Sequence, residues 1–186
     1  FFGGLTIFMD RPFAVGDWIL SPDKNIEGPV EKIGWRQTTI RRFNKRPLYV
    51  PNSVFSTIAV ENPSRMTHRR IYEVIGVRYD DIQQMRAITS AVDQMLRQHD
   101  EIAHDQIIMA RFDEFAASSL NFFIYCMTRT KEWSKFHEVK EDVLLQVADI
   151  IFEHGADVAY PTSRMLIEPQ DPELQELLRN EERTDA

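Results

Sequence analysis

Hydrophobic and polar residues follow a β-like pattern in the first part of this chain. Between Trp18 and Val60 the apolar residues come in short runs, separated by turn residues such as Gly, Pro and Asn. Within the runs, β-branched and aromatic residues alternate with charged ones, as they do in half-buried strands. The pattern predicts strands that together form a small β-barrel, at residues 18–20, 27–35, 37–43, 47–50 and 58–62.

The pattern changes to longer elements after a polar, basic segment at residues 64–70, which predicts a linker. Residues 71–77, 107–112 and 120–127 predict strands. Apolar residues at helical spacing predict one helix through residues 82–96, capped by Asp80, and a second from about residue 135, capped by Ser134 and ended by Gly155. A last short strand is expected at residues 158–161. This order of elements is ferredoxin-like.

The chain begins with nine residues that are apolar and carry no charge. They predict a helix that is too short to cross a bilayer, which needs about 20 apolar residues. The sequence begins without Met, so we expect an excerpt whose start lies inside a longer helix. Two interpretations stay open: a buried helix end in a soluble protein, or the last turns of a transmembrane helix. Pro12 ends this helix, and Gly16-Asp17 predicts a turn before the first strand.

Composition and charge narrow the class of protein. The chain has 186 residues, 43% of them hydrophobic, which is enough for one or two domains with cores. Its single cysteine, Cys126, suits a reducing compartment. Residues 1–70 carry a balance of +5 and residues 71–186 one of −12, within a net charge of −7. An anionic membrane beside the basic half would explain this split, and so would nucleic acid.

Five basic residues in the predicted barrel could form an ordinary solvated face or contact nucleic acid. The second interpretation needs aromatic residues that stack on bases. Trp35, Phe43 and Tyr49 are the candidates, but in so small a barrel we expect them to lie in the core. The basic residues are Arg36, Arg41, Arg42, Lys45 and Arg46.

An enzyme is not indicated. The five histidines are scattered, without metal-ligand spacing, and are expected to be ordinary surface residues. Cys126 lies in an apolar strand and predicts a buried, inert thiol. There is no glycine-rich phosphate loop. We therefore expect neither an active site nor a cofactor nor a metal.

Several motifs occur in a fixed order: Asp10-Arg11-Pro12-Phe13 with Gly16-Asp17-Trp18-Ile19, then Glu27-Gly28-x-Val30 with Ile33-Gly34-Trp35-Arg36, then Leu48-Tyr49-Val50-Pro51-Asn52-Ser53 and Asn62. With these motifs the chain resembles the small-conductance mechanosensitive channel (MscS) family, and more closely its larger bacterial members with extra transmembrane helices. The likeness continues through residues 116–122 and 154–161, and covers residues 1 to about 168.

The resemblance implies a membrane-channel fragment of α+β class. Residues 1–12 would be the end of a pore-lining transmembrane helix, and residues 13–64 an Sm-like β-domain. Residues 65–161 would be a ferredoxin-like α/β domain that walls a vestibule, and residues 162–186 a C-terminal barrel strand and an acidic tail. The tail, Pro169–Ala186, is expected to be disordered.

The resemblance further implies a mechanosensitive ion channel of the bacterial inner membrane, with most of this chain on the cytoplasmic side. Membrane tension would open it and release ions on hypo-osmotic shock. Its partners would be the lipid bilayer, the permeating ions and copies of itself, in a homoheptamer, with no nucleic acid. The alternative is a soluble, Sm-like, oligomeric RNA-binding protein.

Three groups of residues are candidates for functional or structural roles in such a channel. Gly3 and Gly4 allow close helix packing or a hinge. Arg11, Pro12 and Phe13 would form a junction at the membrane interface, where Arg11 either anchors the chain or pairs with an acid elsewhere. Structural motif positions of the family are Gly28, Pro51 and Asn52. Gate residues would lie upstream of residue 1.

Overall fold

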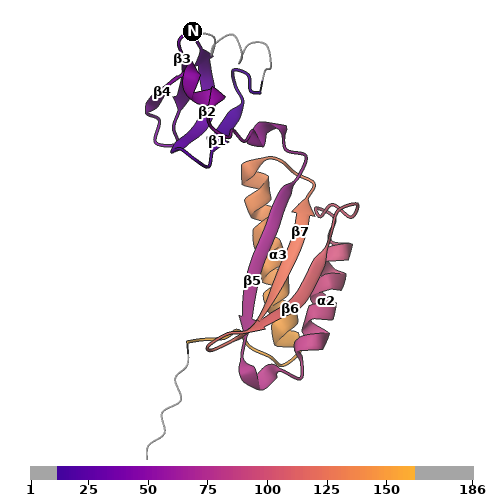
Figure 1. Ribbon diagram of the computed structural model, residues 1–186. Helices are drawn as coiled ribbons and strands as arrows, with labels where there is room; N and C mark the ends of the chain where they lie inside the picture. Colours follow the sequence, from indigo (N-terminus) through magenta and orange to yellow (C-terminus); the bar gives the residue numbers. More distant parts are fainter. Residues whose placement is uncertain (1–11, 162–186) are drawn as a thin grey trace, which may run out of the picture. The chain divides into compact units, whose positions relative to one another are not determined.

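The computed structural model describes residues 12–161 (Figure 1). The chain divides into two units. One comprises the chain up to Arg69 together with Thr128–His137, and the other comprises Arg70–Met127 and the chain from Glu138 onward. Within the described residues, no helix combines the length and the apolar character that crossing a bilayer requires.

The first unit contains a four-stranded antiparallel sheet in the order β1-β2-β3-β4. Its strands are β1 (Trp18–Ser21), β2 (Ile26–Ile33), β3 (Gln37–Arg41) and β4 (Pro47–Pro51). Two 3-10 helices follow, η1 (Asn52–Ser56) and η2 (Pro63–Arg65). The predicted alternation places one apolar set inside, and this small core consists of Phe13, Ile19, Ile26, Val30, Ile40 and Val50.

The predicted strand at residues 58–62 is reduced to a single bridge. Leu20 and Glu61 exchange two backbone hydrogen bonds, of 3.0 and 2.8 Å. The pairing stops there because Pro63, which has no N–H, begins η2 directly after Asn62. The predicted linker at residues 64–70 is also shorter than expected, since it contains the end of η2 and the start of the next strand.

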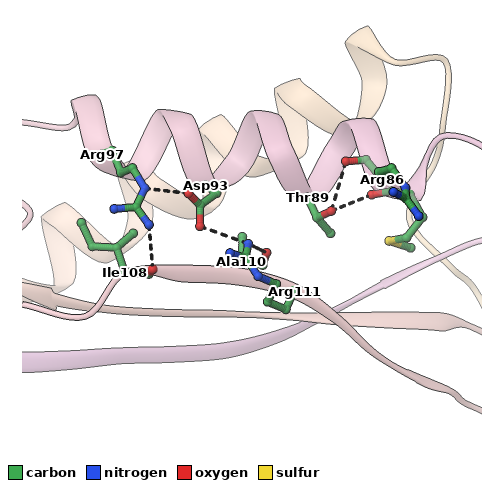
Figure 2. A network of polar contacts seen from close by, with 8 residues as sticks. Arg86, Thr89, Asp93, Arg97, Ile108, Ala110 and Arg111 are labelled. Carbon is green, nitrogen blue, oxygen red and sulfur yellow. Dashed lines mark hydrogen bonds and ion pairs between the residues drawn. The ribbon is translucent and has the colours of Figure 1, made fainter.

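The second unit contains a three-stranded sheet in the order β5-β7-β6. The strands are β5 (Arg69–Val77), β6 (Met109–Phe115) and β7 (Leu120–Thr128), and the helices are α2 (Met85–Gln98) and α3 (Trp133–Glu153). The first residues of α3, up to His137, are counted with the first unit. In Figure 2 both helices lie on the same side of the strands. The central strand β7 explains this, because every second residue is buried: Leu120, Phe122, Ile124, Cys126 and Thr128.

Helix α2 begins later than predicted. Asp80 does not cap it; a 3-10 helix, η3 (Tyr79–Asp81), and a turn precede Met85. The reason is that the buried Asp81 carboxylate accepts hydrogen bonds from the Arg78 side chain (2.9 Å) and the Asp157 N–H (3.0 Å), which hold η3 in place. The predicted apolar stripe is confirmed in its main part, since Met85, Ile88, Val92 and Leu96 are buried.

Helix α3 begins at Trp133, so Ser134 lies inside its first turn and is not its cap. Its predicted end is confirmed: Gly155 has a φ of +72°, and the Ala156 N–H donates to the Ile151 carbonyl at 3.1 Å.

Strand β6 runs to Phe115, past its predicted end at residue 112, because the hairpin turn is short and closes with a 2.9 Å bond from the Ala116 N–H to the Ser119 carbonyl. The last predicted strand is again one bridge, between Val77 and Val158.

Candidate functional site

The described part of the first unit begins with a short anchored segment at residues 12–18, which we call the junction. Phe13 is buried in the core of the unit, and its ring meets that of Phe55 edge-on at 5.0 Å between centroids. A buried aromatic ring immediately after Pro12 fixes the position of the backbone at this point.

The turn of the junction is closed by its own backbone and by Asp17. The Ala14 N–H donates to the Asp17 carboxylate at 3.0 Å, and the Asp17 N–H donates to the Ala14 carbonyl at 3.1 Å. Gly16 adopts a φ of +95°, which favours glycine. Hydrogen bonds from the Gly16 N–H to the Val30 carbonyl (2.7 Å) and from the Val30 N–H to the Asp17 carbonyl (2.8 Å) then attach the turn to β2.

The segment before η2 braces this turn from the other side. The Asn62 side-chain amide donates to the Asp17 carboxylate at 2.9 Å and to the Pro12 carbonyl at 3.2 Å. The Trp18 N–H donates to the Ser64 hydroxyl at 2.8 Å, and the Arg65 guanidinium lies 3.7 Å from Asp17. The hydrogen bond from Asn62, the one from Ala14 and the charge of Arg65 lower the pKa of Asp17.

Asn52, one of the motif positions, makes hydrogen bonds to the start of β3 and to the turn that precedes this strand. Its side chain is 2% exposed and accepts from the Thr38 hydroxyl at 2.8 Å. The same amide donates to the carbonyls of Gly34 (2.8 Å) and Trp35 (3.1 Å) in the turn between β2 and β3. Pro51, the last residue of β4, directs the chain into η1 with an extended backbone.

Gly28 lies where two strands approach each other too closely for a side chain. Its φ is +140°, and a Cβ atom there would lie 2.2 Å from the Arg41 carbonyl oxygen. Because that neighbour is backbone, the sheet itself would have to move to admit any other residue.

The three aromatic residues predicted as core or stacking residues of the first unit do not lie in its core, so the core prediction is wrong for them. Trp35, Phe43 and Tyr49 are 75%, 78% and 59% exposed. Trp35 lies in the turn between β2 and β3 and Phe43 in the turn between β3 and β4, so the two are at opposite ends of β3. They therefore do not gather into one stacking platform of the kind that binds single-stranded nucleic acid.

Two of the basic residues of this unit, Arg41 and Arg42, make hydrogen bonds within it. Arg41 makes two 2.7 Å hydrogen bonds to Glu31, and these lower the pKa of Glu31. Arg42 donates to the Asn25 carbonyl.

Cys126 and His99, two of the residues considered for catalysis, are buried or held by hydrogen bonds of the fold. Cys126 is buried, which raises its pKa to about 12. His99 is largely buried, contrary to the expectation of a surface histidine; it contacts the Asp142 carboxylate at 2.9 Å and accepts from the Glu101 N–H at 3.2 Å. Within residues 12–161, no group of three His, Cys, Asp or Glu side chains could hold a metal ion.

Both units match sequences of known channels. Residues 1–65 match the family described as mechanosensitive ion channel, beta-domain, and residues 73–158 match mechanosensitive ion channel MscS, C-terminal. The chain belongs to the MscS family. This MscS family chain is 49% identical over 172 residues to the low conductance mechanosensitive channel YnaI of Escherichia coli, across 92% of the chain and 50% of YnaI.

Solved structures of channels of this family have a similar fold. A cryo-EM structure of Arabidopsis thaliana MSL1 has a TM-score of 0.80 and 27% identity, over 86% of this chain and 57% of that one. The closed state of Helicobacter pylori MscS has a TM-score of 0.75 and 22% identity, over 90% of this chain and 64% of that one, and supports the fold. The chain spans about half the length of the curated relatives it matches first.

The candidate residues of this MscS family member fall into two groups. Pro12, Phe13, Gly28, Pro51 and Asn52 have the surroundings given above, whereas Gly3, Gly4 and Arg11 lie outside the described residues. Sequence reasoning missed the brace formed by Asp17, Asn62 and Ser64. Two of these three stand in the motifs that carry the resemblance, which was the available signal, but Ser64 was assigned to a linker.

Proposed function

We propose that this chain is part of a mechanosensitive ion channel that membrane tension opens, releasing ions on hypo-osmotic shock. The observation that carries the proposal is that two channel-family matches cover, in order, residues 1–65 and 73–158. A relative with 49% identity bears the name of a mechanosensitive channel. The same findings favour the channel over a soluble RNA-binding protein, and the separation of Trp35 from Phe43 agrees with that preference.

In this proposal residues 1–12 are the end of a pore-lining transmembrane helix, and residues 13–64 an Sm-like β-domain. Residues 65–161 form a ferredoxin-like vestibule domain, and residues 162–186 a C-terminal barrel strand and an acidic tail. The sheet order β5-β7-β6 and the bridge of Val158 to Val77 support the ferredoxin-like assignment. The protein works as a homoheptamer in the bacterial inner membrane, with this chain on the cytoplasmic side, and without enzymatic activity.

The mechanism we infer is a shift of population. Tension favours the conformation with the larger area in the membrane plane, so the pore helices separate. The junction gives this motion a fixed support. Phe13 is buried in the β-unit, and Asn62 holds both Pro12 and Asp17, so the helix end has a fixed point of attachment. The glycines and Arg11 belong to that helix end as packing or hinge residues and as an interfacial residue.

Patch-clamp recording tests the channel function. The full-length protein is produced in a host that lacks its own mechanosensitive channels, and suction is stepped while current is recorded. Step-like currents that rise with tension support the proposal, with membranes carrying an empty vector as the control. Silence up to patch rupture, with the protein shown to be in the membrane, contradicts it. A soluble protein that copurifies with RNA would favour the alternative.

The role of the junction is tested by Asn62→Ala in the same recordings. Without the amide, Pro12 and Asp17 lose a shared donor, so tension is transmitted less directly and the tension for half-opening rises. Asn44→Ala, in the exposed turn between β3 and β4, is the matched control, because the Asn44 side chain accepts only a local bond from the Arg46 N–H (3.1 Å). Equal half-opening tensions for Asn62→Ala and the wild type would overturn this role while leaving the channel function intact.

A further inference from the structure

Polar side chains cover the outer edge of β6 at its N-terminal end. Strand β6 ends the sheet order β5-β7-β6, so one side of its backbone has no strand beside it within the described residues. Such an edge is a template for pairing with a strand of another chain. The register pairs Ala110 with Ile124 and Arg111 with Phe123, and successive residues of a strand point their N–H and C=O groups to opposite sides.

Helix α2 supplies an acceptor for this edge (Figure 2). The Asp93 carboxylate, whose side chain is 16% exposed, accepts the backbone N–H of Ala110. That N–H therefore points outward, away from β7. A carboxylate that accepts a strand N–H takes the place of the carbonyl that a neighbouring strand would offer.

Two arginines cover the outward carbonyls. Arg97, one helical turn after Asp93, donates from Nη2 to the Ile108 carbonyl at 3.2 Å. Arg111 folds back and donates from Nη1 to the carbonyl of Ala110 at 2.7 Å. Consecutive outward groups at the start of this edge, from the carbonyl of Ile108, directly before β6, to the Ala110 carbonyl, are thus bonded to side chains.

The three side chains also hold one another. Asp93 Oδ2 lies 2.7 Å from Arg97 Nε, and Asp93 Oδ1 lies 3.2 Å from Arg111 Nη1. Burial works against the charge of Asp93, but the two arginines and the Ala110 N–H outweigh it and lower its pKa. The group is therefore charged and fixed in place near neutral pH.

We propose that Asp93, Arg97 and Arg111 form an edge guard that prevents β6 from adding a strand of a second copy of this chain. The guard goes beyond the proposed channel function and does not depend on it. Any protein that assembles from many copies gains from such a guard, because it excludes edge-to-edge pairing and leaves assembly to other surfaces.

The test uses Asp93→Ala in the full-length protein, with Asp149→Ala, an exposed carboxylate on α3, as the matched control. Hydrogen exchange is read at single-residue resolution by mass spectrometry. At low concentration the Ala110 amide of Asp93→Ala should exchange about tenfold faster than in the wild type, since it has lost its acceptor. The Arg111 amide, which faces β7, should not change. An unchanged rate at Ala110 would overturn the proposal.

The second readout is association. As concentration rises, Asp93→Ala should form particles larger than the wild-type assembly, measured by light scattering, and in those particles the Ala110 amide should become protected again. Larger particles with a fast Ala110 amide would mean association through another surface and would overturn the guard, as would an unchanged particle mass. If Asp93→Ala does not fold, Arg97→Met, which leaves the bond between Asp93 and Ala110, should show a smaller increase in mass.

Discussion

Asn52 and Phe122 are both buried, and the difference between them describes the difference between the two units. Asn52 is held by individual hydrogen bonds to Thr38, Gly34 and Trp35, none of which belongs to a repeating pattern. Phe122 is one of five alternate residues that β7 buries. The first unit thus adds single polar contacts at irregular backbone positions to its small apolar core, whereas the second relies mainly on the periodic burial of apolar side chains. The two should fail for different reasons.

The largest expected effect is a cavity in the second unit. Phe122→Ala removes a fully buried ring and should lower the free energy of unfolding by about 3–5 kcal/mol. Phe123→Ala, on the half-buried face of the same strand, is the control and should cost less than half as much. Denaturant unfolding followed by the helical circular dichroism of α2 and α3 reports this unit. Equal losses for the two variants would contradict the assignment of faces.

A backbone clash in the first unit comes next. Gly28→Ala places a methyl group against the Arg41 carbonyl and should cost about 3 kcal/mol, because overpacking and backbone strain add. Gly16→Ala is the control: its φ is also positive, but nothing lies near its Cβ position, so about 1 kcal/mol of strain is expected. All three tryptophans belong to the first unit, so their fluorescence follows this loss.

The loss of one amide is a smaller change in the same unit. Asn52→Ala should cost about 2 kcal/mol, because the Thr38 hydroxyl and two turn carbonyls lose their partner at a buried site. Asn44→Ala, in an exposed turn, should stay within about 0.5 kcal/mol of the wild type. The comparison of the units fails if the tryptophan transition is the same in both variants.

The smallest expected effect is a pH dependence at the junction. The folded pKa of Asp17 is lowered below its unfolded value of about 3.9, so its contribution is present above that pH and is lost as the pH falls through the folded pKa. Below about pH 4, the free energy of unfolding of the first unit should therefore fall less with decreasing pH in Asp17→Asn than in the wild type. Tryptophan fluorescence measures this. The transition of the second unit, where Asp81 and Asp93 also have lowered pKa values, should keep its acid dependence.

The sequence was most informative where the fold is periodic. The apolar stripe on α2 and the alternating burial of β7 follow from the spacing of apolar residues alone. The end of α3 was predictable as well, because a helix end needs a residue that tolerates a positive φ, and glycine does. The start of α2 could not be predicted in this way, because Asp81 is held by Asp157, which lies 76 residues further along the chain.

The candidate site shows the same limit. Asp17 and Asn62 each stand in one of the motifs. They are 45 residues apart, so the hydrogen bond from the Asn62 amide to the Asp17 carboxylate could not be predicted from the sequence. Trp35 and Phe43 were misplaced because an apolar residue in a short alternating run predicts a core position, and the turns that carry them were not recognised as ends of the sheet. In the edge guard, the spacing of Asp93 and Arg97 on a helix is visible in the sequence, but their contacts with β6 are not.

The burial of Cys126 has a practical consequence. It is the one thiol of this sequence, and it is closed off inside β7 with a pKa near 12, so maleimide reagents should leave it unmodified in the folded protein. Within residues 1–186, a cysteine introduced at an exposed position, such as Leu145 on α3, would then be the one reactive thiol for a fluorophore or spin label. Distances from that label could be measured in this chain without first replacing Cys126.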